Sequence, residues 1–203
     1  VIFGKGAEAT IQGGLVKSDT EYAAITGNGI NNTAENNSGT KITITGGTVQ
    51  NYVDAAIFHP QDGDLIIDGG HVYGATAIIM KSGNLDIYGG SHIYANGAYA
   101  EPLVAGSGQN STGDAILVYG GSGYTGDITI NIHITEYKDD PLNSGQLTSE
   151  NAYAIREFSD TTTDTRTSSV KISSGVIQSI FGRWGMLPTS ENILFTETLR
   201  DRA

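Results

Sequence analysis

The chain has 203 residues, of which 28 are Gly, 4 are Pro and none is Cys; 16% are charged, and the formal net charge is −11. This Gly content without Pro richness or a triplet period excludes a collagen-like chain, and the lack of Cys excludes disulfides, thiolate catalysis and zinc–thiolate sites. No basic cluster is present, so we expect no nucleic-acid binding, and no apolar run approaches the ~18 residues of a membrane span, so we expect no membrane insertion.

A short strand that ends in a pair of Gly residues recurs along the chain and indicates an internal repeat. Within each copy apolar and polar residues alternate, which is typical of a strand with one buried face. We therefore expect the apolar side chains to point inward and the polar ones to point outward. The copies are residues 9–14, 41–47, 64–70 and 84–90, followed by 127–131 without a Gly pair and 170–175 with one Gly.

Two further short strands follow the first one in each unit. The second strands are residues 15–17, 48–50, 71–73 and 92–94, and the third are 23–25, 55–57 and 76–78, a series that 115–117 and 154–155 continue. The first Gly residues of successive pairs, Gly13, Gly46, Gly69 and Gly89, are 33, 23 and 20 residues apart. A coil of about 20 residues matches three strands with tight corners, and the longer intervals indicate loops inserted at corners, such as 27–39, 102–113 and 138–150.

These patterns predict an all-β fold: a single-stranded, right-handed parallel β-helix (solenoid) of about six coils with three short strands per coil. The right hand follows from the crossover rule for parallel strands. The coils are expected over about 7–180, and residues 181–203 are expected to form a C-terminal cap that contains Phe181, Trp184, Met186, Leu187 and Phe195. We expect 1–203 to be one domain and a fragment of a larger protein. A β-sandwich is disfavoured because it has no reason to repeat triplets of strands around one fixed corner.

The segments Ile42-Thr43-Ile44-Thr45-Gly46-Gly47-Thr48-Val49 and Ala55-Ala56-Ile57-Phe58-His59-Pro60-Gln61 resemble the right-handed parallel β-helix proteins of the pectate-lyase-like superfamily. They are closest in look to the Gly-Gly-Thr-rich repeat regions of gut bacterial surface proteins. The resemblance covers roughly residues 7–180 and implies an extracellular or cell-surface location. It says little about activity, because the same fold carries lyases, hydrolases, phage tailspikes and adhesins.

The outward positions are the candidate functional residues. If 132–134 is a second strand, His71, His92 and His133 stack in one column, each before an inward aliphatic residue. Aromatic rings bind sugar rings by apolar stacking, while Asp, Asn and His supply hydrogen bonds to hydroxyls. The predicted carbohydrate-binding residues are Asp68, His71, Tyr73, Asp86, Tyr88, His92, Tyr94, Asn131 and His133.

The sequence therefore predicts an adhesin, or a carbohydrate-binding or structural stalk, whose partner is a glycan or a host or cell-surface ligand. Three alternatives stay open: a plain solvated sheet face, a structural spacer, and a polysaccharide-active lyase or glycoside hydrolase fragment. The enzyme is disfavoured because the Gly-His-Gly and Arg-Ile-Lys motifs of the polygalacturonase-like enzymes are absent. Lyases of this fold need an Arg or Lys base, and Lys81 is the one Lys or Arg between Gly46 and Tyr137. No cofactor and no catalytic residue are expected.

Metal binding is expected to be limited. Three His residues in a straight ladder cannot easily converge on one ion. A site on two neighbouring coils that uses one Asp stays open, and calcium could bind the acidic corner at Asp62-Gly63-Asp64.

Overall fold

The computed structural model describes residues 2–3, 5–27, 38–103, 110–120, 124, 126–135, 144–159, 167–180, 186–187 and 193–195. Phe181, Trp184 and most of the expected cap lie outside these residues, as do most residues of the three expected corner loops. Met186, Leu187 and Phe195 belong to two short strands. In the described part of the chain no helix has the length and hydropathy needed to span a membrane.

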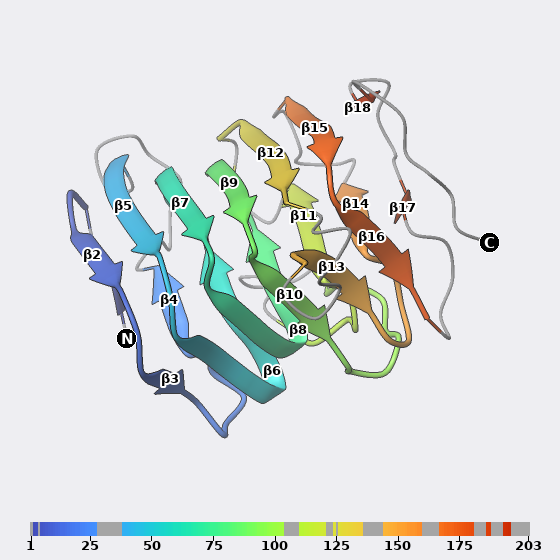
Figure 1. Ribbon diagram of the computed structural model, residues 1–203, viewed down its shortest axis with the longest axis horizontal. Coiled ribbons are helices and arrows are strands. Elements are labelled where there is room, and N and C mark those ends of the chain that lie inside the picture. Colours follow the sequence, from blue (N-terminus) through green and yellow to red (C-terminus); the bar gives the residue numbers. More distant parts are fainter. Residues whose placement is uncertain are drawn as a thin grey trace.

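The structure is all-β, and its strands form two sheets in which every described pair is parallel, as the sequence predicts. The first sheet runs in chain order from one end of the molecule to the other (Figure 1). Its strands are β2 (Glu8–Ile11), β5 (Ser38–Ile44), β7 (Asp62–Asp68), β9 (Gly83–Gly89), β12 (Ile128–Ile134), β15 (Ser168–Ser174) and β18 (Ile193–Phe195).

The second sheet contains the predicted second and third strands together. In two passes of the chain they merge into one long strand, and in the others they remain separate. The long strands are β6 (Thr48–His59) and β8 (His71–Met80). The others are β1 (Ile2–Phe3), β3 (Leu15–Lys17), β4 (Ile25–Gly27), β10 (His92–Ala95), β11 (Ile116–Gly120), β13 (Gln146–Ser149), β14 (Ile155–Ser159), β16 (Val176–Ser179) and β17 (Met186–Leu187).

Aliphatic side chains from both sheets fill the space between them, and like residues stand in register. Four inward columns run through the stack. They are Ile42–Leu65–Leu85–Ile130–Val170, Ile44–Ile67–Ile87–Ile132–Ile172, Val16–Val49–Val72–Ile93–Leu147–Ile177 and Ile25–Ile57–Ile78–Ile116–Ile155. The inward and outward faces assigned from alternation are confirmed.

The Gly pairs form the corners between the first sheet and the second. One Gly of each of the first four pairs has a positive φ, for example 75° at Gly47 and 90° at Gly69. A Cβ on Gly47 would lie 2.6 Å from Gly14 O, so this corner also brings backbone against backbone. A positive φ and a close approach of backbone, two conditions that favour Gly, therefore both apply at Gly47.

A second, smaller apolar cluster covers the outer side of the third strands. It contains Phe58, Ile79 and Leu117, which stand in one register column, together with Tyr119 and the partly buried Phe158. The outer face of the third strands is therefore buried, and the predicted solvent-facing columns lie on the first and second strands.

Candidate functional site

The nine predicted binding residues lie on two outer faces of the molecule that the Gly corners separate. One group lies on β8 and β10 of the second sheet, and the other on β7, β9 and β12 of the first sheet. The first group is His71, Tyr73, His92 and Tyr94; the second is Asp68, Asp86, Tyr88, Asn131 and His133.

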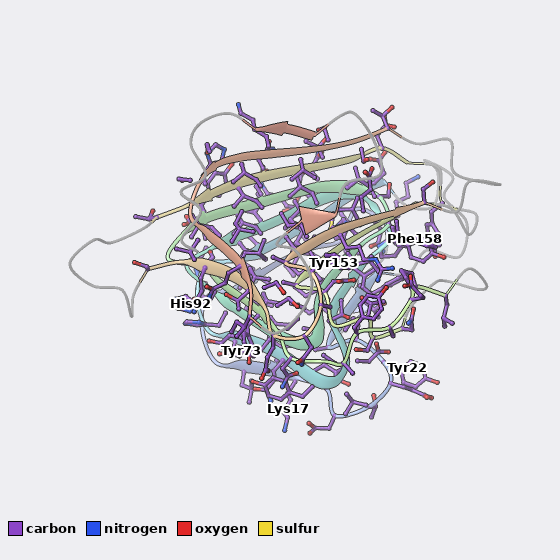
Figure 2. The ribbon with its side chains drawn as sticks, turned by 90° about the vertical axis from the view of Figure 1, so that its right-hand side faces the viewer. Lys17, Tyr22, Tyr73, His92, Tyr153 and Phe158 are labelled. Atoms are coloured by element: carbon purple, nitrogen blue, oxygen red, sulfur yellow. The ribbon has the colours of Figure 1, made fainter. Side chains whose placement is uncertain are left out.

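The face around β8 and β10, which we call the aromatic face, consists of two parallel outward columns. Two columns arise because the outward positions of each second strand lie two residues apart and every strand pair is in register. The first column is Leu15–Thr48–His71–His92–Gln146–Val176, and the second is Lys17–Gln50–Tyr73–Tyr94–Thr148–Gln178. Figure 2 places Lys17, Tyr73 and His92 along one side of the molecule, away from Phe158.

Four aromatic side chains meet at the centre of the aromatic face. The ring centroids of His71 and His92 are 5.0 Å apart, and those of Tyr73 and Tyr94 are 6.2 Å apart in an edge-on arrangement. The Tyr73 hydroxyl lies 3.0 Å from Nδ1 of His71. These contacts hold the four rings against one another, so the face presents ordered aromatic groups rather than independent side chains.

Neighbouring polar groups fix the edge of this cluster. Tyr94 donates a hydrogen bond from its hydroxyl to Oε2 of Glu150 (2.8 Å), and Nε2 of Gln146 lies 3.4 Å from Nδ1 of His92. Burial, then the hydrogen bond and the charge of Glu150, raise the pKa of Tyr94 to about 12. Burial also raises the pKa of Tyr73, and burial and the nearby His71 lower the pKa of His92. The tyrosines are therefore neutral hydroxyl groups at physiological pH.

Tyr52 lies near this cluster, although the alternation of the strands does not single it out. Its electrostatic influence contributes to the raised pKa values of both Tyr73 and Tyr94, and its side chain is 46% exposed. It lies on β6 where the register between β6 and β8 shifts, between Asn51 and Ala55. Strict alternation does not extend through such an irregularity, but an aromatic residue two positions after Gln50, on the same strand, was a usable signal.

The other face, which we call the acidic face, pairs amides with carboxylates across neighbouring strands. Asn84 donates to Oδ1 of Asp64 (2.9 Å), and Asn131 donates to Oδ1 of Asp86 (2.8 Å). Each pair joins residues that stand directly in register. Two of the outward carboxylates therefore already have amide donors.

His133 lies on the acidic face, so the predicted column of three His residues is wrong. Its ring stacks on Tyr88 with centroids 5.5 Å apart and planes 9° apart, and its Nδ1 contacts the Ser173 hydroxyl. Because no Gly pair follows Asn131, the chain makes no corner there and β12 continues to Ile134. The partner of His92 in the next pass is instead Gln146 on β13, so the expected loop 138–150 contains a strand of the second sheet.

The same error displaced Asn131, because aligning residues 84–90 and 127–131 as copies of one unit places Asn131 beside Tyr88. The structure places Asn131 next to Asp86 and His133 next to Tyr88, two residues from the expected register. A slip of two residues keeps every side chain on its own face, whereas a slip of one would have inverted them. The inward assignments therefore survived, while the outward alignment of β12 with β9 did not.

Asp68 and Asp86, the two carboxylates among the predicted binding residues, lie on neighbouring strands of the acidic face but not in register. Asp68 pairs with Tyr88, and Asp86 pairs with Ile66. Lys81, the candidate base, is fully buried with Nζ 3.3 Å from the ring centroid of Tyr119. The cation–π contact with Tyr119 lies in the interior of the protein, so Lys81 is not presented on the outer face that carries both carboxylates.

A buried charged cluster lies beside the third strands, and the sequence reading did not identify it. The guanidinium of Arg156 lies 5.2 Å from the ring centroid of Tyr99 and 5.5 Å from that of Tyr153, and it forms ion pairs with Glu101 and, at 3.9 Å, with Asp114. Arg156 follows Phe58, Ile79 and Leu117 in one register column. A charged residue in an otherwise apolar column was the sequence signal that could have identified the cluster. The cluster ties the segment around Tyr99 to β14.

Comparison with known proteins gives no relative: no protein-family model, no curated protein and no solved structure matches the chain.

Proposed function

We propose that the chain is a module of a bacterial surface protein, located outside the cell, that binds carbohydrate through the aromatic face and acts as an adhesin or stalk. The observation that carries this proposal is the cluster of Tyr73 and Tyr94 with His71 and His92 on that face, with Tyr52 nearby. Aromatic rings supply apolar stacking surface, while hydroxyl and imidazole groups supply directional hydrogen bonds, the combination that sugar rings require.

The architecture we propose is a single-stranded, right-handed parallel β-helix of about six coils with three short strands per coil and a C-terminal cap, of the pectate-lyase-like type. Parallel pairing throughout, four aliphatic columns in register and the recurring Gly corners support it. Such an architecture repeats a flat outer face at intervals of about 4.8 Å, which suits an extended chain of sugar units.

The charge of the aromatic face indicates the class of glycan. Lys17 is the one residue of its two columns with a permanent charge, and it lies at the end of the columns near β2. The central rungs carry only His, Tyr, Thr and Gln. The chain as a whole has a net charge of −11 and repels polyanions. We therefore expect a neutral glycan, whose binding changes little with ionic strength because no ion pair is involved.

The test is a glycan array followed by titration of the best neutral ligand. The Tyr73→Ala/Tyr94→Ala variant is expected to lose at least about tenfold in affinity, since it removes two stacking surfaces. Tyr88→Ala is the matched control, because Tyr88 is an outward aromatic residue on the acidic face. Undiminished binding by the double variant, or equal loss in the control, would contradict the assignment. Release of reducing ends or unsaturated sugars that Asp68→Asn or Asp86→Asn abolishes would favour the enzyme instead.

A further inference from the structure

His71 and His92 form a pair that is independent of any glycan, and we infer that the two imidazoles bind one late first-row transition-metal ion, with Cu²⁺ or Zn²⁺ as the best candidates. They stand directly in register on the neighbouring parallel strands β8 and β10. Residues that stand in register on adjacent strands have the shortest side-chain separation between two neighbouring passes of the chain. The pair therefore depends on the backbone pairing, not on a flexible loop.

The separation of the two rings fits a shared ion. With a metal–nitrogen bond of about 2.1 Å and a ring centre about 1.1 Å behind the nitrogen, each centre lies about 3.2 Å from the ion. For angles at the metal between 90° and the tetrahedral value, the two ring centres then lie about 4.5–5.2 Å apart. The centroids of His71 and His92 are 5.0 Å apart, within that interval.

The hydrogen bonds of the two rings leave the correct atoms for an ion. Nδ1 of His71 lies 3.0 Å from the Tyr73 hydroxyl, which leaves Nε2 of that ring as its ligand atom. Nε2 of Gln146 lies 3.4 Å from Nδ1 of His92, so ion binding requires a half-turn of the Gln146 amide. The amide oxygen then accepts from Nδ1–H of His92, and Nε2 of that ring is the ligand atom. Metal-binding His residues are commonly oriented in this way, through a hydrogen bond at the other ring nitrogen. Binding requires neutral imidazoles, because the ligand nitrogen of a metal-bound ring carries no proton.

The identity of the ion follows from the ligands. Imidazole suits Cu²⁺, Zn²⁺ and Ni²⁺, whereas Ca²⁺ and Mg²⁺ require several oxygen ligands. Among the described residues no group of three or more His, Cys, Asp or Glu could hold a metal ion, so water completes the coordination. A site with two protein ligands is open and exchangeable, and affinity in the order Cu²⁺ above Zn²⁺ is expected.

The experiment is isothermal titration of the metal-free chain, without a polyhistidine tag, with ZnCl₂ and with CuCl₂. His71→Gln and His92→Gln are the test variants, because Gln146 already occupies the same column and the substitution is compatible with the sheet. His133→Gln is the matched control, because it removes an outward imidazole that lies on the acidic face beside Tyr88.

We expect one ion per chain, a loss of at least about tenfold in affinity for either test variant, and no change for the control. A rise in melting temperature on adding Zn²⁺ should occur in the native chain and in the control but not in the test variants. The inference is overturned if the native chain binds no ion, if both test variants bind as the native chain does, or if the control loses affinity equally. Circular dichroism of each variant establishes that it is folded.

Discussion

Asp114 offers a sharp test of the balance between burial and ion pairing in this fold. Its side chain is fully buried, accepts hydrogen bonds from the Thr112 hydroxyl (2.7 Å) and the Tyr153 amide (3.0 Å), and lies 3.9 Å from the Arg156 guanidinium. Burial outweighs these stabilising contacts and raises the pKa of Asp114 from 3.8 to about 6. The folded state therefore holds a proton more tightly than the unfolded state does.

The consequence is a loss of stability as the pH rises from about 4 to about 6. Each unit of pKa difference corresponds to about 1.4 kcal/mol, so Asp114 lowers the free energy of unfolding by about 3 kcal/mol across this interval. In Asp114→Asn the group no longer titrates. The stability of that variant relative to the native chain should therefore rise by about 3 kcal/mol between pH 3.5 and pH 7.

Denaturant unfolding of the native chain and of Asp114→Asn, measured at several pH values, provides the comparison. Taking the difference between the two proteins cancels the titration of every other group that the substitution leaves unperturbed. Asp68→Asn controls for the removal of one negative charge at an exposed position. A relative stability that falls with rising pH would mean that the Arg156 ion pair dominates over burial, and our reasoning would then be refuted.

Three further perturbations address the corners and the core. Asn51 donates to Thr20 O, Tyr22 O and Ala55 O and accepts from two backbone amides, so Asn51→Ala should lower the free energy of unfolding by about 3 kcal/mol or more in denaturant titrations. Gly47→Ala should lower the free energy of unfolding by at least about 2 kcal/mol more than Gly69→Ala does. Both Gly residues have a positive φ, but of the two only Gly47 would place its Cβ within 3 Å of backbone atoms. Equal melting temperatures of the two variants would contradict this prediction. Burial lowers the pKa of His59, so stability should fall as the pH drops below about 6.5, by at most about 1.4 kcal/mol per pH unit, and the His59→Gln variant should lack this slope.

The sequence predicted the faces of the strands better than it predicted their register. Alternation depends on one strand at a time, so Ile130 and Ile134 were correctly placed inward. Register depends on where the corner falls, and the missing Gly pair after Asn131 removed the only local marker of it. A repeat unit is recognisable from its own residues, but its alignment with the next unit is a tertiary property.

The functional residues that the sequence missed share a physical reason. Tyr52 follows a register shift, and Arg156 and Asp114 acquire their surroundings from segments more than 30 residues away. The side-chain amide of Asn51 donates hydrogen bonds to carbonyl groups of the preceding pass of the chain. Each depends on contacts between passes, which the pattern within one pass does not contain.

The two outer faces differ in a way that core packing does not require. Both rest on the same kind of aliphatic columns, so the inward residues place no demand on the chemistry of the outward ones. On the acidic face, Asn84 and Asn131 donate to the carboxylates of the preceding strand, an arrangement that offsets charge within the stack. On the aromatic face, His71 stands beside His92 and Tyr73 beside Tyr94, so the same two aromatic residue types recur on two adjacent rungs. Thr or Gln at these positions, as in the rungs on either side, would pair equally well within the sheet, which is why we assign the ligand-binding role to this face.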